Sequence, residues 1–425
     1  MKQADSGGRP NTSTIARAAV LLTVLLLGLP LTAGAGPYPL IVQIAPGLNI
    51  VSIVAALGGT LIDSIPDAGT YLLNLPAIPS PVQAGLLGIQ WLELNQGVTL
   101  PGFIQLGVVA VPATVGADWY KYQPAMVLVR SGPALSQSTG RGIVVADLNS
   151  RLDVAHPALV GHLTSGYDFV ANQPAGAVAL NQSSASFMDQ SGSFLDQSSA
   201  SFMDQSSGRF IDQLLPALNP AYSHGTLCAG IIAVVAPDSM IMPLRVFDDR
   251  GSSDLFTIAK AIRYAVQQGA EVINMSFGTL GDSQALKSAI KFALDRNVVL
   301  VASAGNNNTS APQFPAGYPG VMAAAATDLA DRKAAFSNYG PSVYVDAPGV
   351  NIFSSYPGGY YSVVSGTSFS APIVAAAAAL IRSLRRTDPA SSIATGAVNI
   401  DSRNPSYANQ LGYGRVDVLR AVSPD

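Results

Sequence analysis

Histidine and cysteine side chains, which could do acid–base or nucleophilic chemistry, are few in this chain, and this limits the possible catalytic residues. The 425 residues include three histidines, His156, His162 and His224, and one cysteine, Cys228. A single cysteine rules out an intramolecular disulfide and a structural zinc site built from cysteines. A mechanism that needs an imidazole must therefore use one of these histidines.

Three segments carry residue types that together suit acyl transfer. Asp147 follows an apolar run at 143–146, His224 opens the sequence His-Gly-Thr, and Ser368 lies within Gly-Thr-Ser-Phe-Ser-Ala-Pro at 366–372. A serine hydroxyl is a poor nucleophile near neutral pH, so it needs an imidazole to accept its proton and a carboxylate to orient that imidazole. We predict that Ser368, His224 and Asp147 fill these roles.

The order of these residues along the chain separates two kinds of serine hydrolase. The order here is Asp, His, Ser, whereas α/β-hydrolases run Ser, Asp, His around a Gly-x-Ser-x-Gly motif. Ser370 stands where the second glycine of that motif would be. Both observations argue against a lipase or esterase.

A second carboxylate, Asp153, competes with Asp147 for the role of orienting His224. Asp147 directly follows a predicted strand, so a rigid element would hold its carboxylate to the tolerance that catalysis needs. Asp153 lies in the irregular stretch beyond it. We therefore assign the role to Asp147.

The elements that must position these residues are strands and helices in alternation. From residue 142 onward the pattern predicts an α/β fold with a doubly wound, mostly parallel sheet that helices cover on both faces. Working residues of such a sheet lie at the carboxyl ends of its strands, where Asp147, Ser276 and Asn306 fall. The expected strands are 143–146, 272–275 and 298–301, and the expected helices are 283–296, 368–385 and one between Ser253 and Gly269.

Together these segments resemble the subtilisin-like serine proteases, the subtilases, over residues 120–422. The resemblance implies a secreted endopeptidase with Asp147, His224 and Ser368 as its triad and the amide of Asn306 in the oxyanion hole. Further matching segments are Val-Ile-Asn-Met-Ser-Phe-Gly at 272–278, Val-Ala-Ser-Ala-Gly-Asn at 301–306, Phe-Pro-Ala at 314–316, Ala-Phe-Ser-Asn at 335–338 and Leu-Gly-Tyr-Gly-Arg-Val at 411–416.

The resemblance also assigns two substrate-binding segments. The edge that pairs with an extended polypeptide substrate and walls the primary pocket would be Ser276, Phe277 and Gly278. The floor of that pocket would be Ser303, Ala304 and Gly305. Backbone pairing gives affinity with little sequence preference, so we expect a broad, mainly apolar preference.

Two departures from the family bear on activity. The segment after Asp147 is two residues longer than usual before the family's turn, which is Asp-Val-Ala-His-Pro at 153–157 here. This enlargement leaves open an inactive relative that serves as a binding protein. The segment between Gly230 and Pro237 is too short for the calcium-binding loop of many subtilases, so we expect no metal at the active site and no required cofactor, with weak calcium sites elsewhere left open.

The amino-terminal residues suggest export. Basic residues precede an uncharged run at 18–31, which ends in small residues and is shorter than the roughly 20 apolar residues of a membrane span. We expect a signal peptide at 1–35 and an extracellular or periplasmic protein, with an uncleaved anchor as the alternative.

The residues that follow predict a small separate domain. Strand, helix, strand, strand, helix and strand patterns at 36–100 indicate a ferredoxin-like α+β unit. It resembles the family's inhibitory propeptides, so the chain's own propeptide is an expected partner; a fused accessory domain is the alternative. A linker at 101–120 would lead to the catalytic domain at 121–425.

Repeats and charge complete the sequence-based expectations. The nine residues at 182–190 recur unchanged at 197–205, within a Ser-rich stretch at 181–213 that we interpret as a surface insertion. The net charge of −3, from 23 basic and 26 acidic side chains, argues against a nucleic-acid partner. We expect a monomer.

Overall fold

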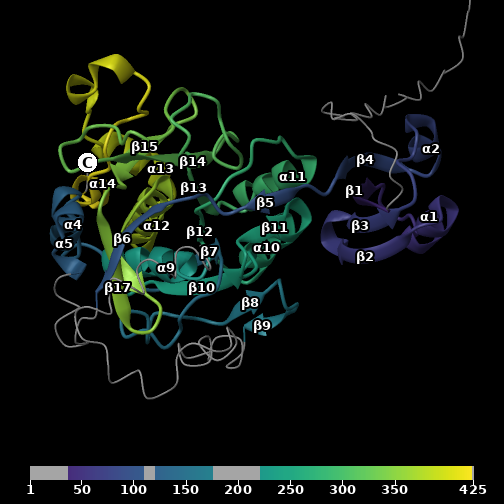
Figure 1. Cartoon of the computed structure of the whole chain (residues 1–425), viewed down its shortest axis with the longest axis horizontal. Helices are drawn as coiled ribbons and strands as arrows, with labels where there is room; N and C mark the ends of the chain where they lie inside the picture. Colours follow the sequence, from purple (N-terminus) through teal and green to yellow (C-terminus); the bar gives the residue numbers. More distant parts are fainter. Residues whose placement is uncertain (1–36, 110–119, 176–220, 424–425) are drawn as a thin grey trace, which may run out of the picture. The chain divides into compact units, whose positions relative to one another are not determined.

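The computed structural model describes residues 37–109, 120–175 and 221–423. These residues form two compact units that divide between Leu94 and Asn95 (Figure 1). The expected signal peptide and Ser-rich insertion lie outside the described residues. Among the helices that are described, none has the length and apolar character to cross a membrane.

The first unit is the predicted α+β domain. Its antiparallel sheet has the strand order β2-β3-β1-β4, and its core gathers side chains such as Leu40, Val42 and Leu73. The side chain of Asn49 caps α1, and Gly58 ends that helix in the left-handed conformation. The elements are β1 (Tyr38–Ile44), α1 (Ile50–Leu57), β2 (Thr60–Ile65), η1 (Pro66–Ala68), β3 (Thr70–Leu75), α2 (Pro81–Leu86) and β4 (Ile89–Leu94).

The second unit contains the predicted doubly wound sheet. Its eight strands have the order β15-β14-β13-β12-β7-β10-β8-β9, and all neighbours except β8 and β9 are parallel. The strands are β7 (Val144–Asn149), β8 (Gly166–Asp168), β9 (Gln173–Ala175), β10 (Met240–Arg245), β12 (Val272–Met275), β13 (Val299–Ser303), β14 (Val321–Thr327) and β15 (Val345–Pro348).

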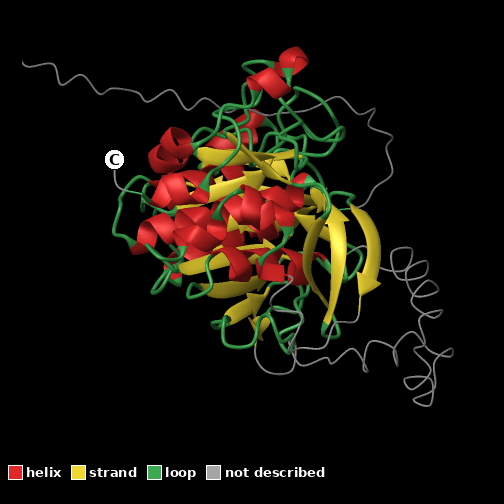
Figure 2. Cartoon of the chain, turned by 90° about the vertical axis from the view of Figure 1, so that its left-hand side faces the viewer, coloured by secondary structure: helices red, strands yellow, loops and turns green. Residues whose placement is uncertain are grey.

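Helices pack over the strands of this sheet (Figure 2). Helices α9 and α12 pack against each other, as do α10 and α11. The helices of the unit are α4 (Pro124–Leu128), α5 (Ser131–Ala134), α9 (His224–Val235), α10 (Leu255–Gln267), α11 (Gln284–Leu294), α12 (Thr367–Ser383), α13 (Pro389–Gly396), η3 (Asp401–Arg403), η4 (Pro405–Tyr407) and α14 (Val418–Val422).

The alternation of side chains along β7 decides what faces the helices. Val145 belongs to the core that α9 and α12 cover. Because every second residue of a strand points to the same face, Asp147 and Asn149 also face these helices. On the neighbouring strand β12, Asn274 pairs with Asp147 in register. The sheet thus brings three polar side chains together under α9.

Residues 95–109 belong to the second unit, and they contain two strands where the sequence predicted mainly a linker. β5 (Gly97–Thr99) pairs antiparallel with β11 (Ser252–Asp254), and β6 (Ile104–Val109) pairs antiparallel with β17 (Tyr360–Ser365), which also pairs with β16 (Ile352–Tyr356). The expected linker at 101–120 therefore includes a strand. Edge strands of the second unit supply the hydrogen-bond partners that order it.

Candidate active site

The imidazole of His224 contacts the side-chain amide of Asn149, whereas the sequence predicted the carboxylate of Asp147. Nδ1 of His224 lies 2.7 Å from Oδ1 of Asn149, and no hydrogen bond joins His224 to Asp147. Asp147 lies behind the amide, where Nδ2 of Asn149 donates to its carboxylate at 3.3 and 3.4 Å. The prediction that Asp147 orients His224 by direct contact is therefore wrong.

The length of β7 explains this correction. The apolar run ends at Ala146, but β7 continues to Asn149 because β10 pairs with it to the end. Asn149, not Asp147, thus stands at the carboxyl end of the strand, beside the first residue of α9. The signal that could have located it is the two-residue spacing, which places both side chains on one face.

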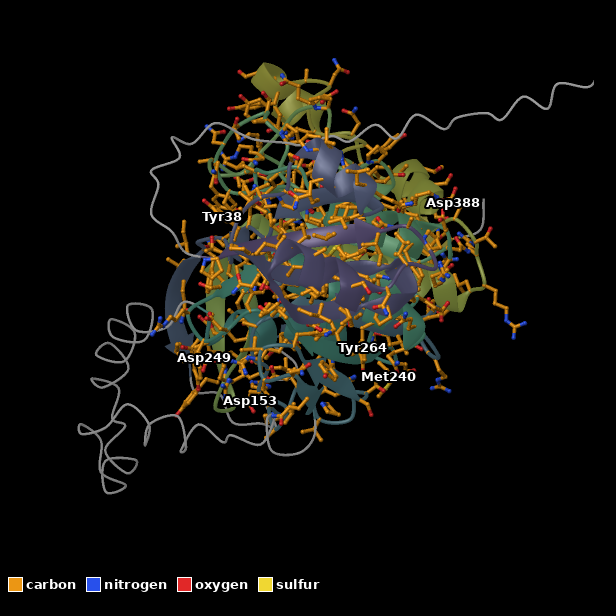
Figure 3. All side chains as sticks on the ribbon, turned by 90° about the vertical axis from the view of Figure 1, so that its right-hand side faces the viewer. Tyr38, Asp153, Met240, Asp249, Tyr264 and Asp388 are labelled. Atoms are coloured by element: carbon orange, nitrogen blue, oxygen red, sulfur yellow. The ribbon has the colours of Figure 1, made fainter. Side chains whose placement is uncertain are left out.

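Asp153, which is labelled in Figure 3, has a structural role in the turn after β7. Its carboxylate accepts hydrogen bonds from the backbone N–H groups of Ala155 and Gly358, and its own N–H donates to the hydroxyl of Thr226. It makes no hydrogen bond to His224. The choice against Asp153 as the residue that orients the imidazole agrees with these contacts.

The contact with Asn149 fixes the tautomer of His224. An amide oxygen can only accept, so Nδ1 must carry the ring proton and Nε2 must be unprotonated. His224 is fully buried, and Nε2 has no hydrogen-bond partner among the described residues. Burial lowers the pKa of His224 to about 3, so the ring is neutral over the ordinary pH range. This is the state that a general base requires.

Ser368 lies in the first turn of α12, close to His224. Cys228 of α9 links the two, since its Sγ is 3.9 Å from Nδ1 of His224 and 3.4 Å from the carbonyl oxygen of Ser368. The hydroxyl of Ser368 donates to the carbonyl oxygen of Ser276 at 3.1 Å. A change of side-chain rotamer is therefore the step that would bring it to Nε2.

Asn306 points a donor at a backbone carbonyl. Its Nδ2 donates to the carbonyl oxygen of Gly102 at 2.9 Å, and its Oδ1 accepts from the backbone N–H and the hydroxyl of Thr367. The bonds to Thr367 hold the amide so that its N–H side faces Gly102. The next residue, Phe103, packs its ring against His224 and Phe369 at centroid distances of 5.5 and 5.3 Å.

The two predicted substrate-binding segments enclose the side chain of Gln313. A Cβ added at Gly278 would lie 2.4 Å from Gln313, and one added at Gly305 would lie 2.7 Å from its Oε1. Nε2 of Gln313 donates to the carbonyl oxygen of Ser303 at 3.0 Å. Gln313 thus fills the space between the predicted wall and floor, and sequence reasoning missed it.

The segment 276–278, which was predicted to pair with an extended substrate, makes other contacts in the structure. Phe277 is buried against Phe247, with ring centroids 5.2 Å apart. The strand that pairs with the extended residues 97–99 is β11, and Leu100 donates its N–H to the carbonyl of Gly251. Edge pairing with an extended chain therefore comes from 251–254 in this structure.

The remaining histidine and cysteine candidates have structural surroundings. His156 is buried in the turn after β7, where Nε2 lies 2.8 Å from the carbonyl oxygen of Tyr360 and Nδ1 accepts from the N–H of Ala158. Burial, with a smaller effect from the charge of Asp147, raises the pKa of the Cys228 thiol well above its ordinary value. A thiol in this state is a poor nucleophile.

The buried carboxylate of Asp147 should make the free energy of unfolding depend on pH. Burial raises its pKa from 3.8 to about 6, against the opposing effect of hydrogen bonds from Asn274 and Asn149. The folded protein therefore holds this proton more tightly than the unfolded chain, and the free energy of unfolding falls as the pH rises through about 4 to 6. The free energy of unfolding of an Asp147→Asn variant, relative to that of its parent, should therefore rise by roughly 2 kcal/mol from about pH 4 to about pH 8.

Denaturant unfolding of both proteins at the two pH values measures this difference. A Ser368→Ala background is used in each, so that self-digestion does not distort the transition. An unchanged difference between variant and parent, or one of opposite sign, would show that Asp147 is not a buried carboxylate of raised pKa.

Comparison with known proteins identifies the family. Residues 140–414 match the sequence model described as the Subtilase family. Thermitase from Thermoactinomyces vulgaris is 32% identical over 304 residues, which cover 69% of this chain and 93% of thermitase. The chain belongs to the subtilase family. It is accordingly a serine-type endopeptidase, the class that the motifs in its sequence predicted.

Other relatives of this subtilase agree in sequence and fold. A thermophilic serine proteinase from Bacillus sp. (strain AK1) is 34% identical over 296 residues, covering 67% of this chain and 62% of that protein. Fervidolysin from Fervidobacterium pennivorans, described as a keratinolytic enzyme related to subtilisin, shares the fold with a TM-score of 0.69 and 23% identity, over 92% of this chain and 62% of its own. The subtilisin-like fold expected from the sequence is confirmed.

Membership in the family changes how the segment after Asp147 is interpreted. The sequence suggested two extra residues between the family's aspartate and the turn at 153–157. The structure has no extra loop there, because β7 simply runs on to Asn149. Counting two residues forward from Asp147 gives Asn149 as the residue in the family aspartate's place, and this is the residue that contacts His224.

Proposed function

We propose that this subtilase is an exported endopeptidase in which Ser368 is the nucleophile, His224 the general base and Asn306 an oxyanion donor. The observation that carries the proposal is the hydrogen bond from Nδ2 of Asn306 to the carbonyl oxygen of Gly102. Gly102 lies shortly after β5, whose antiparallel pairing with β11 is the kind of backbone pairing that an extended polypeptide substrate makes. Asn149 takes the role of orienting His224 that was first assigned to Asp147.

Each group has a defined part in the proposed reaction. The hydroxyl of Ser368 gives its proton to Nε2 of His224 as its oxygen attacks the substrate carbonyl. Nδ2 of Asn306 stabilises the negative charge that forms on the carbonyl oxygen, and the amino-terminal end of α12 adds its dipole. His224 then passes the proton to the leaving amine. These side chains supply the chemistry without a cofactor, so any bound calcium would act on stability alone.

The chain's own segment 95–109 is the first substrate that we propose. β5 on one side of Gly102 and β6 on the other are both held by pairing with strands of the second unit. The carbonyl on the Asn306 amide is that of Gly102, so the bond in position for attack joins Gly102 to Phe103. Its cleavage would release the residues before it, including the first unit, as a propeptide.

Amino-terminal sequencing of the secreted protein tests this assignment. We expect the mature chain to begin Phe-Ile-Gln-Leu at Phe103, and we expect a Ser368→Ala variant to keep the residues before it. A cut elsewhere in the Ser368-dependent product would contradict the Gly102–Phe103 assignment. Processing that is independent of Ser368 would contradict self-cleavage.

A small residue before the cleaved bond is the preference that Gln313 supports. Its side chain occupies the space between Gly278 and Gly305, where a large substrate side chain would otherwise insert. The residue that the chain itself presents at this position is glycine, Gly102. We therefore replace the expected broad, apolar preference with a preference for glycine or alanine.

Two peptide substrates taken from residues 99–102 measure this preference. Thr-Leu-Pro-Gly-p-nitroanilide should be cleaved by the mature enzyme with a higher kcat/KM than Thr-Leu-Pro-Phe-p-nitroanilide. A Gln313→Ala variant should raise kcat/KM for the phenylalanine peptide at least about 10-fold, because even a single methylene group in an apolar pocket is worth about 10- to 200-fold. Equal turnover of both peptides by the parent, or no gain in the variant, would show that Gln313 does not close the pocket.

A further inference from the structure

The amide of Asn149 can be turned in two ways, whereas a carboxylate in its place would have no wrong orientation. In the structure, Oδ1 of Asn149 accepts from Nδ1 of His224 at 2.7 Å and from the N–H of Ser150 at 2.9 Å. Nδ2 donates to both carboxylate oxygens of Asp147. Asn149 and Asp147 are 2% and 3% exposed, so water cannot readily replace these partners.

A turned amide would disable the general base. It would present an N–H to Nδ1 of His224, which would then have to accept, and the ring proton would move to Nε2. Nε2 could not take the proton of Ser368 in that tautomer. When an asparagine replaces the triad aspartate of a serine protease and leaves the ring in this tautomer, kcat falls by about 10⁴-fold.

The surroundings of Asn149 oppose the turned state at two points. Its oxygen would face the carboxylate of Asp147, which can only accept, and its NH₂ would face the N–H of Ser150, which can only donate. Both conflicts are buried, where unpaired polar groups are costly. Asp147 is itself held in place, because Nδ2 of Asn274 donates to it at 2.8 Å.

We propose that Asp147 is a positioning residue that acts through Asn149 to keep the proton of His224 on Nδ1. The inference rests on the proposed function, since it assigns the tautomer that His224 needs as base. No proton passes to Asp147 during the reaction. The proton of Ser368 goes to Nε2, the Nδ1 proton stays on the ring, and the carboxylate supports the resulting imidazolium across one amide.

The tautomer can be measured without any catalysis. The full chain with Ser368→Ala is prepared with ¹⁵N in its three histidines, and the His224 signals are identified by their loss in His224→Gln. At mildly alkaline pH we expect the proton on Nδ1. Adding Asp147→Leu should move a substantial fraction of it to Nε2, while Asp153→Asn should leave the spectrum unchanged. A proton that stays on Nδ1 in the Asp147→Leu protein would overturn the proposal, whether or not the enzyme proposal holds.

Activity measurements test whether a second substitution restores the kcat that Asp147→Leu loses. A purely structural role of Asp147 would not allow such a restoration. Asp147→Leu should lower kcat roughly 10²- to 10⁴-fold with KM changed at most a few-fold. Adding Asn149→Asp should restore kcat to within about 10-fold of the parent, because a carboxylate at 149 needs no partner to orient it. Failure of this rescue in a folded protein would overturn the proposal.

A swap of the two side chains covers the case in which Asp147→Leu does not fold. The double variant Asp147→Asn, Asn149→Asp keeps side-chain volume and total charge, and it moves the carboxylate next to His224. We expect at least parental kcat from it. A folded but inactive swap would overturn the proposal, because it would show that the carboxylate at 147 does more than orient the amide of Asn149.

Discussion

A full-length Ser368→Ala variant is expected to show no measurable hydrolysis of casein or of the p-nitroanilide peptides. The hydroxyl of Ser368 is the proposed nucleophile, and the thiol of Cys228, which also lies near His224, is buried with its pKa raised well above the ordinary value. In a subtilisin-type enzyme, loss of the serine lowers kcat by about 2 × 10⁶-fold. The same variant should remain unprocessed when it is secreted.

Cys228→Ala provides the matched control for this prediction. It removes the thiol that lies beside both His224 and Ser368 but leaves the proposed nucleophile and base in place. We expect its activity to stay within a few-fold of the parent. Loss of activity in Cys228→Ala together with retained activity in Ser368→Ala would reverse the assignment of the nucleophile.

An Asn149→Leu variant is expected to lose roughly 10³- to 10⁴-fold in kcat, close to the effect of removing the aspartate of a conventional triad. Leucine has a similar size but no acceptor for the Nδ1 proton of His224, so the ring loses both its orientation and its fixed tautomer. Steady-state kinetics with Thr-Leu-Pro-Gly-p-nitroanilide measure the loss. KM should change little, since the hydrogen bonds of the Asn149 side chain go to Asp147, Ser150 and His224 and not to residues 95–109.

Asp153→Asn is the control for position 149. Its carboxylate accepts only backbone hydrogen bonds in the turn after β7, so the variant should keep activity within a few-fold. If Asp153→Asn were the more damaging of the two changes, the carboxylate of the turn would have to reach His224 in the active enzyme.

The sequence was sufficient for the fold because its patterns agree at every level. Apolar runs such as 298–301 and amphipathic helices such as 284–294 alternate, and only a two-sided parallel sheet buries both. The sequence predicted the boundaries of the helices less accurately than their existence. The helix predicted between Ser253 and Gly269 begins at Leu255, because Asp254 provides the cap and residues 252–254 pair with β5.

The site was harder to predict, because it depends on register and on distant loops. Hydrophobicity located the end of β7 at Ala146, but pairing with β10, which the sequence does not display, continues the strand to Asn149. Gln313 is ten residues beyond Ser303, in an irregular segment with no periodicity to show where its side chain points. Both residues become evident only when the chain is folded.

Covalent labelling of Ser368 tests most directly whether an enzyme with Asn149 beside His224 is catalytically competent. The mature protein is treated with a fluorophosphonate probe at about pH 8, and the adduct is located by peptide mass spectrometry. We predict a single adduct on Ser368, formed at least about 100-fold more slowly in Asn149→Leu. A mature protein that is folded yet leaves Ser368 unlabelled would contradict the account, and it would favour a relative of the proteases that only binds polypeptides.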